Sequence, residues 1–211
     1  MGTKERRRLE LEETRSKILH AARDLFIEHG YEEVTMRAIA RVIDYTPTAI
    51  YHHFENKQAL VSELCIADFD QLARHFLKAA SIADPVERIR SIGDAYLEFA
   101  VAYPNHYRFM FMTKFPMEDV VTHKAVHDDP ERDAYALLRR ACEEAIQQNR
   151  LRPEIENPDE LAQILWGALH GLISIHLLKA DKGYLHLTDL KTTADRTIDI
   201  LIRGMLRDNG K

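Results

Sequence analysis

Helix-start signals recur along this chain and constrain its fold more than any other feature. Four times a capping side chain stands directly before a proline: Thr46-Pro47, Asp84-Pro85, Asp129-Pro130 and Asn157-Pro158. The capping side chain can accept a free backbone N–H of the first turn, and proline is tolerated at the first helical position because its missing N–H would have no partner there. Alternating strand-like stretches are hard to find. The sequence therefore predicts an all-α protein.

Apolar spacing and these start signals together predict about nine helices and no sheet. The expected helices cover residues 12–30, 36–43, 47–54, 57–81, 85–103, 130–149, 158–180 and 189–207, with a loop or a short helix in 113–128. The most apolar stretch, Leu161 to Leu178, contains four polar residues, among them His170 and His176, which would be costly in hydrocarbon. We therefore expect a buried helix there and no membrane span.

Charge is spread unevenly along the chain. The net charge is −5, yet residues 1–60 are neutral, with ten basic and ten acidic side chains, so the rest carries the whole −5. Lys4, Arg6, Arg7 and Arg8 form a basic N-terminal arm. Such an arm is either a solvated tail or an element that follows DNA phosphates, and charge alone does not decide between them.

The expected location is the cytoplasm. The first residues, MGTKERRRLELEETR, lack the apolar stretch of a secretory signal peptide. Cys65 and Cys142 stand alone, without a CxxC pair or a zinc-ligand spacing. Isolated cysteines of this kind are typical of proteins in a reducing compartment.

Residues 39–54 carry the pattern of a helix-turn-helix. Two short helices are separated by a turn of three to four residues, and their apolar side chains can pack together: Ile39, Ala40, Ile43, Ile50 and Phe54. The second helix would then project polar side chains toward a DNA groove: Tyr45, Thr46, Thr48, Tyr51 and His52. An ordinary helical hairpin with a polar face would have the same periodicity.

The order of residues in this region resembles the DNA-binding domain of the TetR family of transcriptional regulators, from Thr14 to about Leu64. The matching features are His29-Gly30-Tyr31, Thr35 before Ile39-Ala40, Tyr51-His52-His53-Phe54, and Asn56-Lys57 followed by Leu60. The resemblance implies a DNA-binding domain in residues 1–58, basic arm included, and an effector-binding and dimerisation domain in residues 59–211. The stretches 103–111 and 166–171 resemble the TetR subgroup with a Trp-His-Gly C-terminal domain.

The resemblance also implies which side chains meet double-stranded DNA. Thr35, Lys57, Tyr51 and His52 are expected on phosphates. Tyr45, Thr46 and Thr48 are expected on base edges or thymine methyl groups, with Arg37 reaching either. His53 is left open between DNA contact and internal packing. Because residues 47–54 contain no Lys or Arg, this helix cannot make bidentate contacts to guanine, so shape, thymine contacts and Arg37 would carry more of the specificity.

Three positions depart from the family pattern. Asp44 stands at the turn where the family usually has glycine, and aspartate tolerates the left-handed backbone region better than most residues. Pro47 and Thr48 replace a basic residue and a glycine at the start of the recognition helix. The added bulk beside the DNA means that the operator sequence cannot be taken from relatives.

The second domain is expected to bind a small apolar or amphipathic effector that remains unidentified. Candidate pocket residues are Phe69, Phe76, Tyr96, Phe99, Tyr103, Tyr107, Phe111, Trp166 and His170. Tyr96, Tyr107, His170 and His176 could orient the ligand through polar contacts. Any one of these aromatic side chains could equally be ordinary core.

The last two helices are the expected homodimer interface, because relatives pair them into a four-helix bundle and Gly167, Ala168, Gly171 and Ser174 would allow close approach. The alternative is that the helix over 161–178 is the buried centre of one protomer. A two-fold dimer predicts a palindromic operator with half-sites about one helical turn apart.

Other function classes have weaker support. His123 and His127 would share a helix face but lack further ligands, so neither a metal nor a cofactor is expected. Phosphate loops, HExxH and nucleophile-elbow motifs are absent, so enzyme activity is not expected. The predicted function is a repressor released from its operator by the effector. An activator or a constitutive DNA-binding protein is the alternative, and an enzyme or carrier that retains a helix-turn-helix is a more distant rival.

Overall fold

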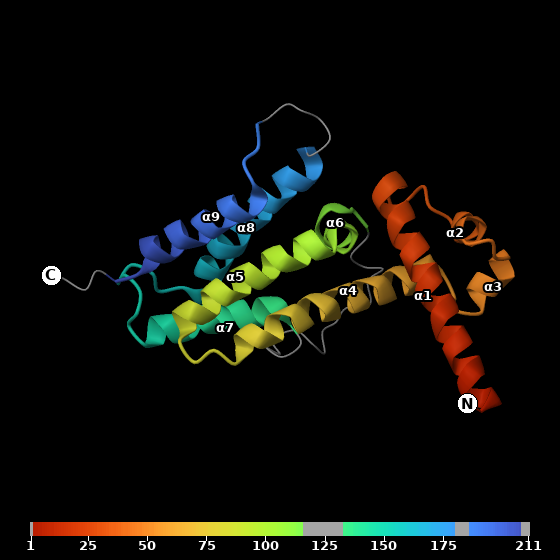
Figure 1. Cartoon of the computed structure of the whole chain (residues 1–211), viewed down its shortest axis with the longest axis horizontal. Coiled ribbons are helices and arrows are strands. Elements are labelled where there is room, and N and C mark those ends of the chain that lie inside the picture. The colour runs from red at the N-terminus through yellow and green to blue at the C-terminus, as the bar shows by residue number, and fades with distance from the viewer. Residues whose placement is uncertain (1, 116–132, 180–185, 208–211) are drawn as a thin grey trace. The chain divides into compact units, whose positions relative to one another are not determined.

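The computed structural model describes residues 2–115, 133–179 and 186–207. Within these ranges the chain forms nine helices and no strand, apart from an isolated bridge between Leu151 and Leu206 (Figure 1). The helices are α1 (Thr3–His29), α2 (Met36–Val42), α3 (Pro47–Tyr51), α4 (Lys57–Ala80), α5 (Pro85–Ala102), α6 (Pro104–Met112), α7 (Ala134–Gln147), α8 (Pro158–Lys179) and α9 (Leu190–Met205). The expected all-α class with about nine helices is confirmed.

Side-chain caps begin most helices where the sequence predicts them. The side chains of Thr35, Thr46 and Asn56 each accept a hydrogen bond from the backbone N–H three residues later, at 3.1, 3.2 and 2.7 Å. The other predicted caps that form are Asp84, Asn157 and Asp189. Each bond satisfies a backbone donor that has no partner inside its helix.

Two helix starts differ from the prediction. Helix α1 begins at Thr3, so the basic arm is helical, and the arginine–glutamate pairs Arg6–Glu10 and Arg8–Glu12 lie one turn apart on its surface, which favours the helix. Helix α7 begins at Ala134, because the Asp133 carboxylate accepts from the N–H groups of residues 135 and 136. The predicted start at 129–130 lies outside the described residues.

Helix α6 is an element that the sequence did not predict. Pro104 occupies its first position, but the preceding Tyr103 has no short side-chain acceptor, so the capping signal used for the other helices is missing. Burial explains why the segment is helical nonetheless, since Tyr107 and Phe109 are completely buried.

The described residues fall into two compact units. The first holds residues 2–68 and 105–115, and the second holds residues 69–104, 133–179 and 186–207. Helix α4 therefore begins in the first unit and ends in the second, while nearly all of α6 belongs to the first. The functional division at residue 58, which the resemblance implies, remains an expectation.

In the second unit, α5 packs against α7, α8 and α9. Gly93 makes this close approach possible, because a Cβ placed there would lie 3.0 Å from Ile198 of α9 and 3.2 Å from Leu169 of α8. Among the described residues, nothing covers one side of α8 and α9: Ile164, Leu178 and Ile200 are 52%, 62% and 70% exposed. The expected burial of the helix over 161–178 is therefore wrong for the single chain, because only one side of it is packed.

The core of the first unit joins all the helices that it contains. Ile18, Ala22 and Phe26 form a buried stripe along α1. They belong to one cluster with Ile39 of α2, Ile50 of α3, Leu60 of α4, Phe109 of α6, and Phe54, which lies between α3 and α4. The rings of Phe26 and Phe109 are stacked with centroids 6.1 Å apart. The predicted packing of the helix-turn-helix is thus confirmed.

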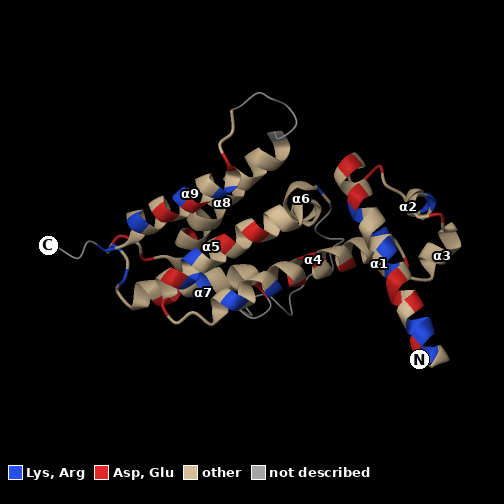
Figure 2. Cartoon of the chain, in the orientation of Figure 1, with Lys and Arg blue, Asp and Glu red and all other residues tan. Residues whose placement is uncertain are grey.

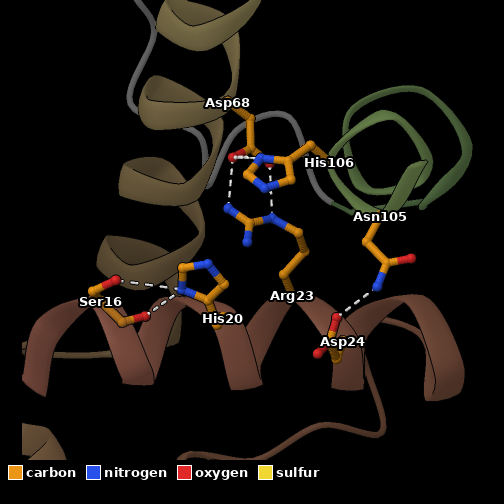
Figure 3. A network of polar contacts seen from close by, with 7 residues as sticks. All are labelled: Ser16, His20, Arg23, Asp24, Asp68, Asn105 and His106. Atoms are coloured by element: carbon orange, nitrogen blue, oxygen red, sulfur yellow. Dashed lines mark hydrogen bonds and ion pairs between the residues drawn. The ribbon is translucent and has the colours of Figure 1, made fainter. Parts of the chain in front are cut away.

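A buried ion pair joins α1 to α4 in this unit. Arg23 donates to both oxygens of Asp68, Nε at 3.0 Å and Nη2 at 2.6 Å, and His106 of α6 lies 2.9 Å from the same carboxylate (Figure 3). The side chains of Arg23 and Asp68 are 5% and 1% exposed. Near the surface, Asn105 donates to Asp24 of α1 at 2.9 Å.

Replacing Asp68 should destabilise the first unit strongly. Asp68→Asn removes the charge that neutralises Arg23, and an unpaired buried charge costs about 3–5 kcal/mol. Asp24→Asn is the matched control, because its contact is exposed and its loss should cost less than about 1 kcal/mol. Urea unfolding followed by circular dichroism measures both, and equal losses would contradict the structural role of the buried pair.

Candidate DNA-binding surface

Helices α2 and α3 form a helix-turn-helix. Asp44 adopts φ of +57° in the turn, as expected for a residue that replaces glycine. The N–H of Tyr45 donates to the carbonyl of Ala40 at 2.9 Å, which closes the turn. Ile39 and Ile50 are fully buried between the helices and the rest of the unit. The turn and the core together fix which side of α3 faces solvent.

The solvent-facing side of this motif carries the predicted polar residues. Tyr45, Thr46, Thr48, Tyr51 and His52 are all exposed. Tyr51 exposes 52% of its surface, although a tyrosine ring is large enough to be stabilised by burial. Helix α3 contains no charged side chain, as Figure 2 shows. Its surface therefore presents hydroxyl groups and rings without a local charge.

The hydroxyl groups of Thr35 and Thr46 can each take part in two hydrogen bonds. Each oxygen accepts the capping hydrogen bond described above. A threonine hydroxyl also has one O–H to donate, and neither O–H has a partner among the described residues. Both hydroxyls can therefore donate to a phosphate oxygen without losing the cap.

Positive charge on the motif comes from α2. Arg37 and Arg41 are exposed, and neither has an ion-pair partner within the described residues. They stand four residues apart, so they lie on one face of the helix. Arg41 was not among the predicted DNA contacts, although its spacing of four residues from Arg37 was a usable signal.

Lys57 is less available than the resemblance implies. Its ammonium group donates to the carbonyls of Tyr31 and Val34 at 2.8 and 3.0 Å, and it lies 4.0 Å from the centre of the Tyr31 ring. Lysine has three N–H donors, so these two bonds leave one for another partner. Lys57 thus anchors the segment between α1 and α2, whatever it does with DNA.

His53, which the sequence left open, is half-buried beside the C-terminal end of α3. Its carbonyl accepts a hydrogen bond from Arg15 Nη1 at 2.7 Å. Burial is the largest cause of a lowered pKa for the His53 ring, which lies below its ordinary value of 6.5. The positive charges of Arg15 and, to a smaller extent, of His52 lower it further. The lowered pKa favours the neutral form of the ring.

The candidate effector residues are divided between the two units. Tyr107 and Phe111 belong to the first unit, where their ring centroids lie 5.0 Å apart. The others belong to the second unit, and among them Phe76, Tyr96 and Phe99 are buried while Phe69 is 41% exposed. Tyr103 is half-buried and packs on Phe99, with centroids 5.6 Å apart.

Three of these residues are linked by hydrogen bonds between α5 and α8. The indole N–H of Trp166 donates to the hydroxyl of Tyr96 at 3.0 Å, and that hydroxyl lies 3.2 Å from His170 Nδ1. The other ring nitrogen of His170 lies 3.4 Å from the hydroxyl of Ser174. Burial lowers the pKa of His170, which favours the neutral ring. His176 instead contacts the carbonyls of Leu172 and Thr188.

A groove of about 400 Å³ lies in a different part of the second unit. It is bounded by α8, α9 and residues 154–157, and no predicted effector residue lines it. Its lining combines the exposed apolar residues Ile164 and Ile200 with the acidic side chains Glu154, Glu156 and Glu160. The same exposed side of α8 and α9 carries Gly167, Gly171 and Gly204, at each of which a Cβ would meet nothing within 4 Å.

Metal ligands do not gather in the part of the chain that the structure describes, where no group of three or more His, Cys, Asp or Glu side chains could hold an ion. His123 and His127 lie outside that part. Cys65 and Cys142 are buried, and burial raises the pKa of each thiol to about 12, so neither forms a reactive thiolate at neutral pH.

Two family profiles match the sequence. Residues 18–64 match the profile described as bacterial regulatory proteins of the tetR family. Residues 89–203, more than half of the chain, match the one described as the tetracyclin repressor-like C-terminal domain. The first match covers α2, α3 and the start of α4, and the second covers most of the helices of the second unit.

Curated relatives are transcriptional regulators. UidR of Escherichia coli is 32% identical over 83 residues, which are 39% of this chain and 39% of UidR, so the match spans about two fifths of that relative. A probable acrEF/envCD operon repressor of Escherichia coli is 25% identical over 213 residues, covering 96% of this chain and 91% of the relative.

Several solved structures share this fold. NalD, the secondary repressor of the MexAB-OprM multidrug efflux pump in Pseudomonas aeruginosa, has a TM-score of 0.68 at 23% identity and covers 93% of this chain and 98% of its own. A TetR family transcription regulator from Marinobacter aquaeolei VT8 has a TM-score of 0.72 at 18% identity, with coverages of 95% and 98%. At these identities the similarity shows the fold. The helix-turn-helix geometry and both profile matches lead to the same conclusion: this chain belongs to the TetR family.

Proposed function

We propose that this regulator is a cytoplasmic repressor that binds a palindromic operator as a homodimer and leaves it when a small apolar or amphipathic effector binds. The observation that carries the proposal is the exposed, uncharged polar surface of α3 next to the unpaired Arg37 and Arg41 of α2. The two full-length similarities, to proteins that are themselves named repressors, support the direction of regulation. No catalytic activity is part of the proposal.

The proposed DNA contacts divide between phosphates and bases. Arg41, Thr35, Tyr51 and His52 would hold the backbone, and the remaining N–H of Lys57 would add to them. Tyr45, Thr46 and Thr48 would contact base edges and thymine methyl groups, with Arg37 reaching either. Because α3 lacks guanidinium groups, it cannot itself make the arginine–guanine contacts that are common among DNA-binding helices.

The proposed dimer forms through α8 and α9. Their uncovered side combines exposed Ile164, Ile175 and Ile200 with glycines that leave room for a second helix. Exposed apolar surface of this kind is typical of a protein interface, and small residues permit close helix approach. Helix α8 is also long and apolar enough to cross a membrane by composition alone, but a helix-helix interface accounts for the same residues without a membrane.

The proposed effector site includes the Trp166–Tyr96–His170 chain of the second unit. Its polar atoms lie among aromatic side chains, an arrangement that suits an amphipathic ligand. Helix α4 runs from the first unit into the second, so a ligand that favours another position of α4 would change the spacing of the two DNA-binding units in a dimer and lower operator affinity.

Selection of duplexes from a random pool, followed by binding assays over a salt series, tests this function. We expect enrichment of a two-fold symmetric sequence with half-site centres about 34–36 Å apart, and affinity that falls by orders of magnitude as salt rises a few-fold. Failure to enrich any sequence would refute the DNA-binding surface proposed here. Activation of a reporter by the selected site would refute repression while leaving DNA binding intact.

Thr48 and Arg41 should have separable effects on DNA binding. Thr48→Ala should alter base preference at a symmetric pair of operator positions, because it removes a base contact. Arg41→Gln should weaken all sequences by a similar factor and reduce the slope of log affinity against log salt by about 0.9 per protomer, because it removes one phosphate contact. Identical effects of the two variants would contradict this division of roles.

Ile200 should be central to the dimer. It is 70% exposed in the protomer, so Ile200→Asp should leave the folded chain intact, whereas burying the carboxylate at an interface should raise the dimer dissociation constant by about thirtyfold or more. Val101→Asp is the control, because Val101 is 61% exposed and belongs to α5, which is not one of the two helices proposed to form the interface. Sedimentation velocity measures both, and an undisturbed Ile200→Asp dimer would exclude this interface.

His53 should not confer pH dependence near neutrality. The pKa of His53 is lowered in the folded protein, which favours the neutral ring, whereas the unfolded chain takes up a proton near pH 6.5. The contribution of His53 to the free energy of unfolding is therefore present above pH 6.5 and is lost as pH falls. Operator affinity of His53→Gln should follow that of the wild type within about twofold between pH 7.5 and 6.5. A gain in affinity at pH 6.5 in the wild type alone would show that His53 is charged on DNA.

A further inference from the structure

The recognition helix is too short to hold its own position. Helix α3 has five residues, and isolated helices shorter than about 12 residues are marginal in water. Its N-terminal end is held by the Thr46 cap. Its C-terminal end is anchored by the buried side chains of Ile50 and Phe54, and the backbone N–H groups of residues 52–54 donate to carbonyls of α3 itself. The hydrogen bond from this end to another helix is accepted by the His53 carbonyl.

Arg15 of α1 makes that connection. Its Nη1 donates to the His53 carbonyl at 2.7 Å, and the carbon of its guanidinium group lies 4.3 Å from the centre of the Phe54 ring. Its other edge forms a two-point contact with the Glu63 carboxylate of α4, with Nε 2.5 Å from Oε1 and Nη2 bonded to Oε2. One side chain therefore ties α1 and α4 to the residues that end α3.

Only arginine can make this set of contacts. Its planar group presents donors along two edges while its face stacks on an aromatic ring, whereas a lysine ammonium is a single point of charge. The two side chains are 38% and 31% exposed. Ion pairs exposed to this degree contribute little to the free energy of unfolding. The contact is thus better suited to fixing geometry than to supplying stability.

We infer that Arg15 is a positioning residue for operator recognition: together with Glu63 it holds the C-terminal end of α3 in the orientation needed to contact bases. The inference rests on the proposed function of α3 as the base-contacting helix. Arg15 lies three residues before the segment that matches the family profile, which begins at residue 18, and Glu63 lies within that segment.

Two variants test the inference in the DNA-free protein. Arg15→Lys keeps the charge but loses the fork and the ring contact, and Glu63→Gln keeps the shape but loses the charge. Both should speed amide hydrogen exchange at residues 50–54 by about tenfold, because a local opening that lacks one charge-assisted hydrogen bond is more populated. Arg139→Lys, in a pair with Asp159 of comparable exposure in the second unit, should leave these amides unchanged. Unchanged exchange in both test variants would overturn the inference.

DNA binding supplies the second readout. Arg15→Lys should lose about tenfold in affinity for the selected duplex while keeping its affinity for a scrambled duplex at low salt, because the positive charge remains. Thermal unfolding should change by only a few degrees. An equal loss of affinity for both duplexes would mean that Arg15 contacts phosphate directly. An undiminished affinity for the selected duplex would mean that the C-terminal end of α3 needs no support from Arg15. Either result overturns the positioning role. If the wild type enriches no duplex, the proposed function fails, but the exchange experiment still decides whether Arg15 fixes α3.

Discussion

Burial of the α1 stripe is the interaction on which the DNA-binding unit depends. Helices α2 and α3 have seven and five residues, too few to be stable alone, and they persist because Ile39 and Ile50 are completely buried in the same cluster as Phe26 of α1. The exposed residues of α3 can face DNA only because its apolar residues are held inside. Stability and recognition are therefore properties of one packed cluster rather than of the motif alone.

Local chemistry made much of the fold predictable. The caps at Thr35 and Thr46 and the turn at Asp44 each depend on a few neighbouring residues, and each forms as the sequence predicts. The errors lie where local signals compete with tertiary contacts. Helix α6 lacks a capping side chain and is held by buried residues such as Phe109, and α7 begins at a capping aspartate that the stronger signal at 129–130 obscured.

The same distinction between local signals and tertiary contacts applies to the candidate site. Because Ile50 is buried, helical periodicity places the polar side chains of α3 on the solvent side. This exposure could therefore be predicted from the sequence. The bonds from Lys57 to carbonyls 26 and 23 residues earlier, and from Arg15 to Glu63 48 residues later, arise from the folded arrangement and have no local signal. The aromatic residues expected in one effector pocket lie in two units for the same reason, since composition shows that such residues are present but not where they meet.

The absence of charge from α3 affects how such a protein would find its target. Sequence-independent attraction to a polyanion arises from cations, and here these lie on α2 and α1, beside the helix proposed to contact bases rather than on it. Non-specific sliding along DNA and specific binding at the operator would then depend largely on different side chains. Ionic strength would govern how fast the search proceeds, whereas discrimination among sequences would be comparatively insensitive to it, so evolution could alter one without the other.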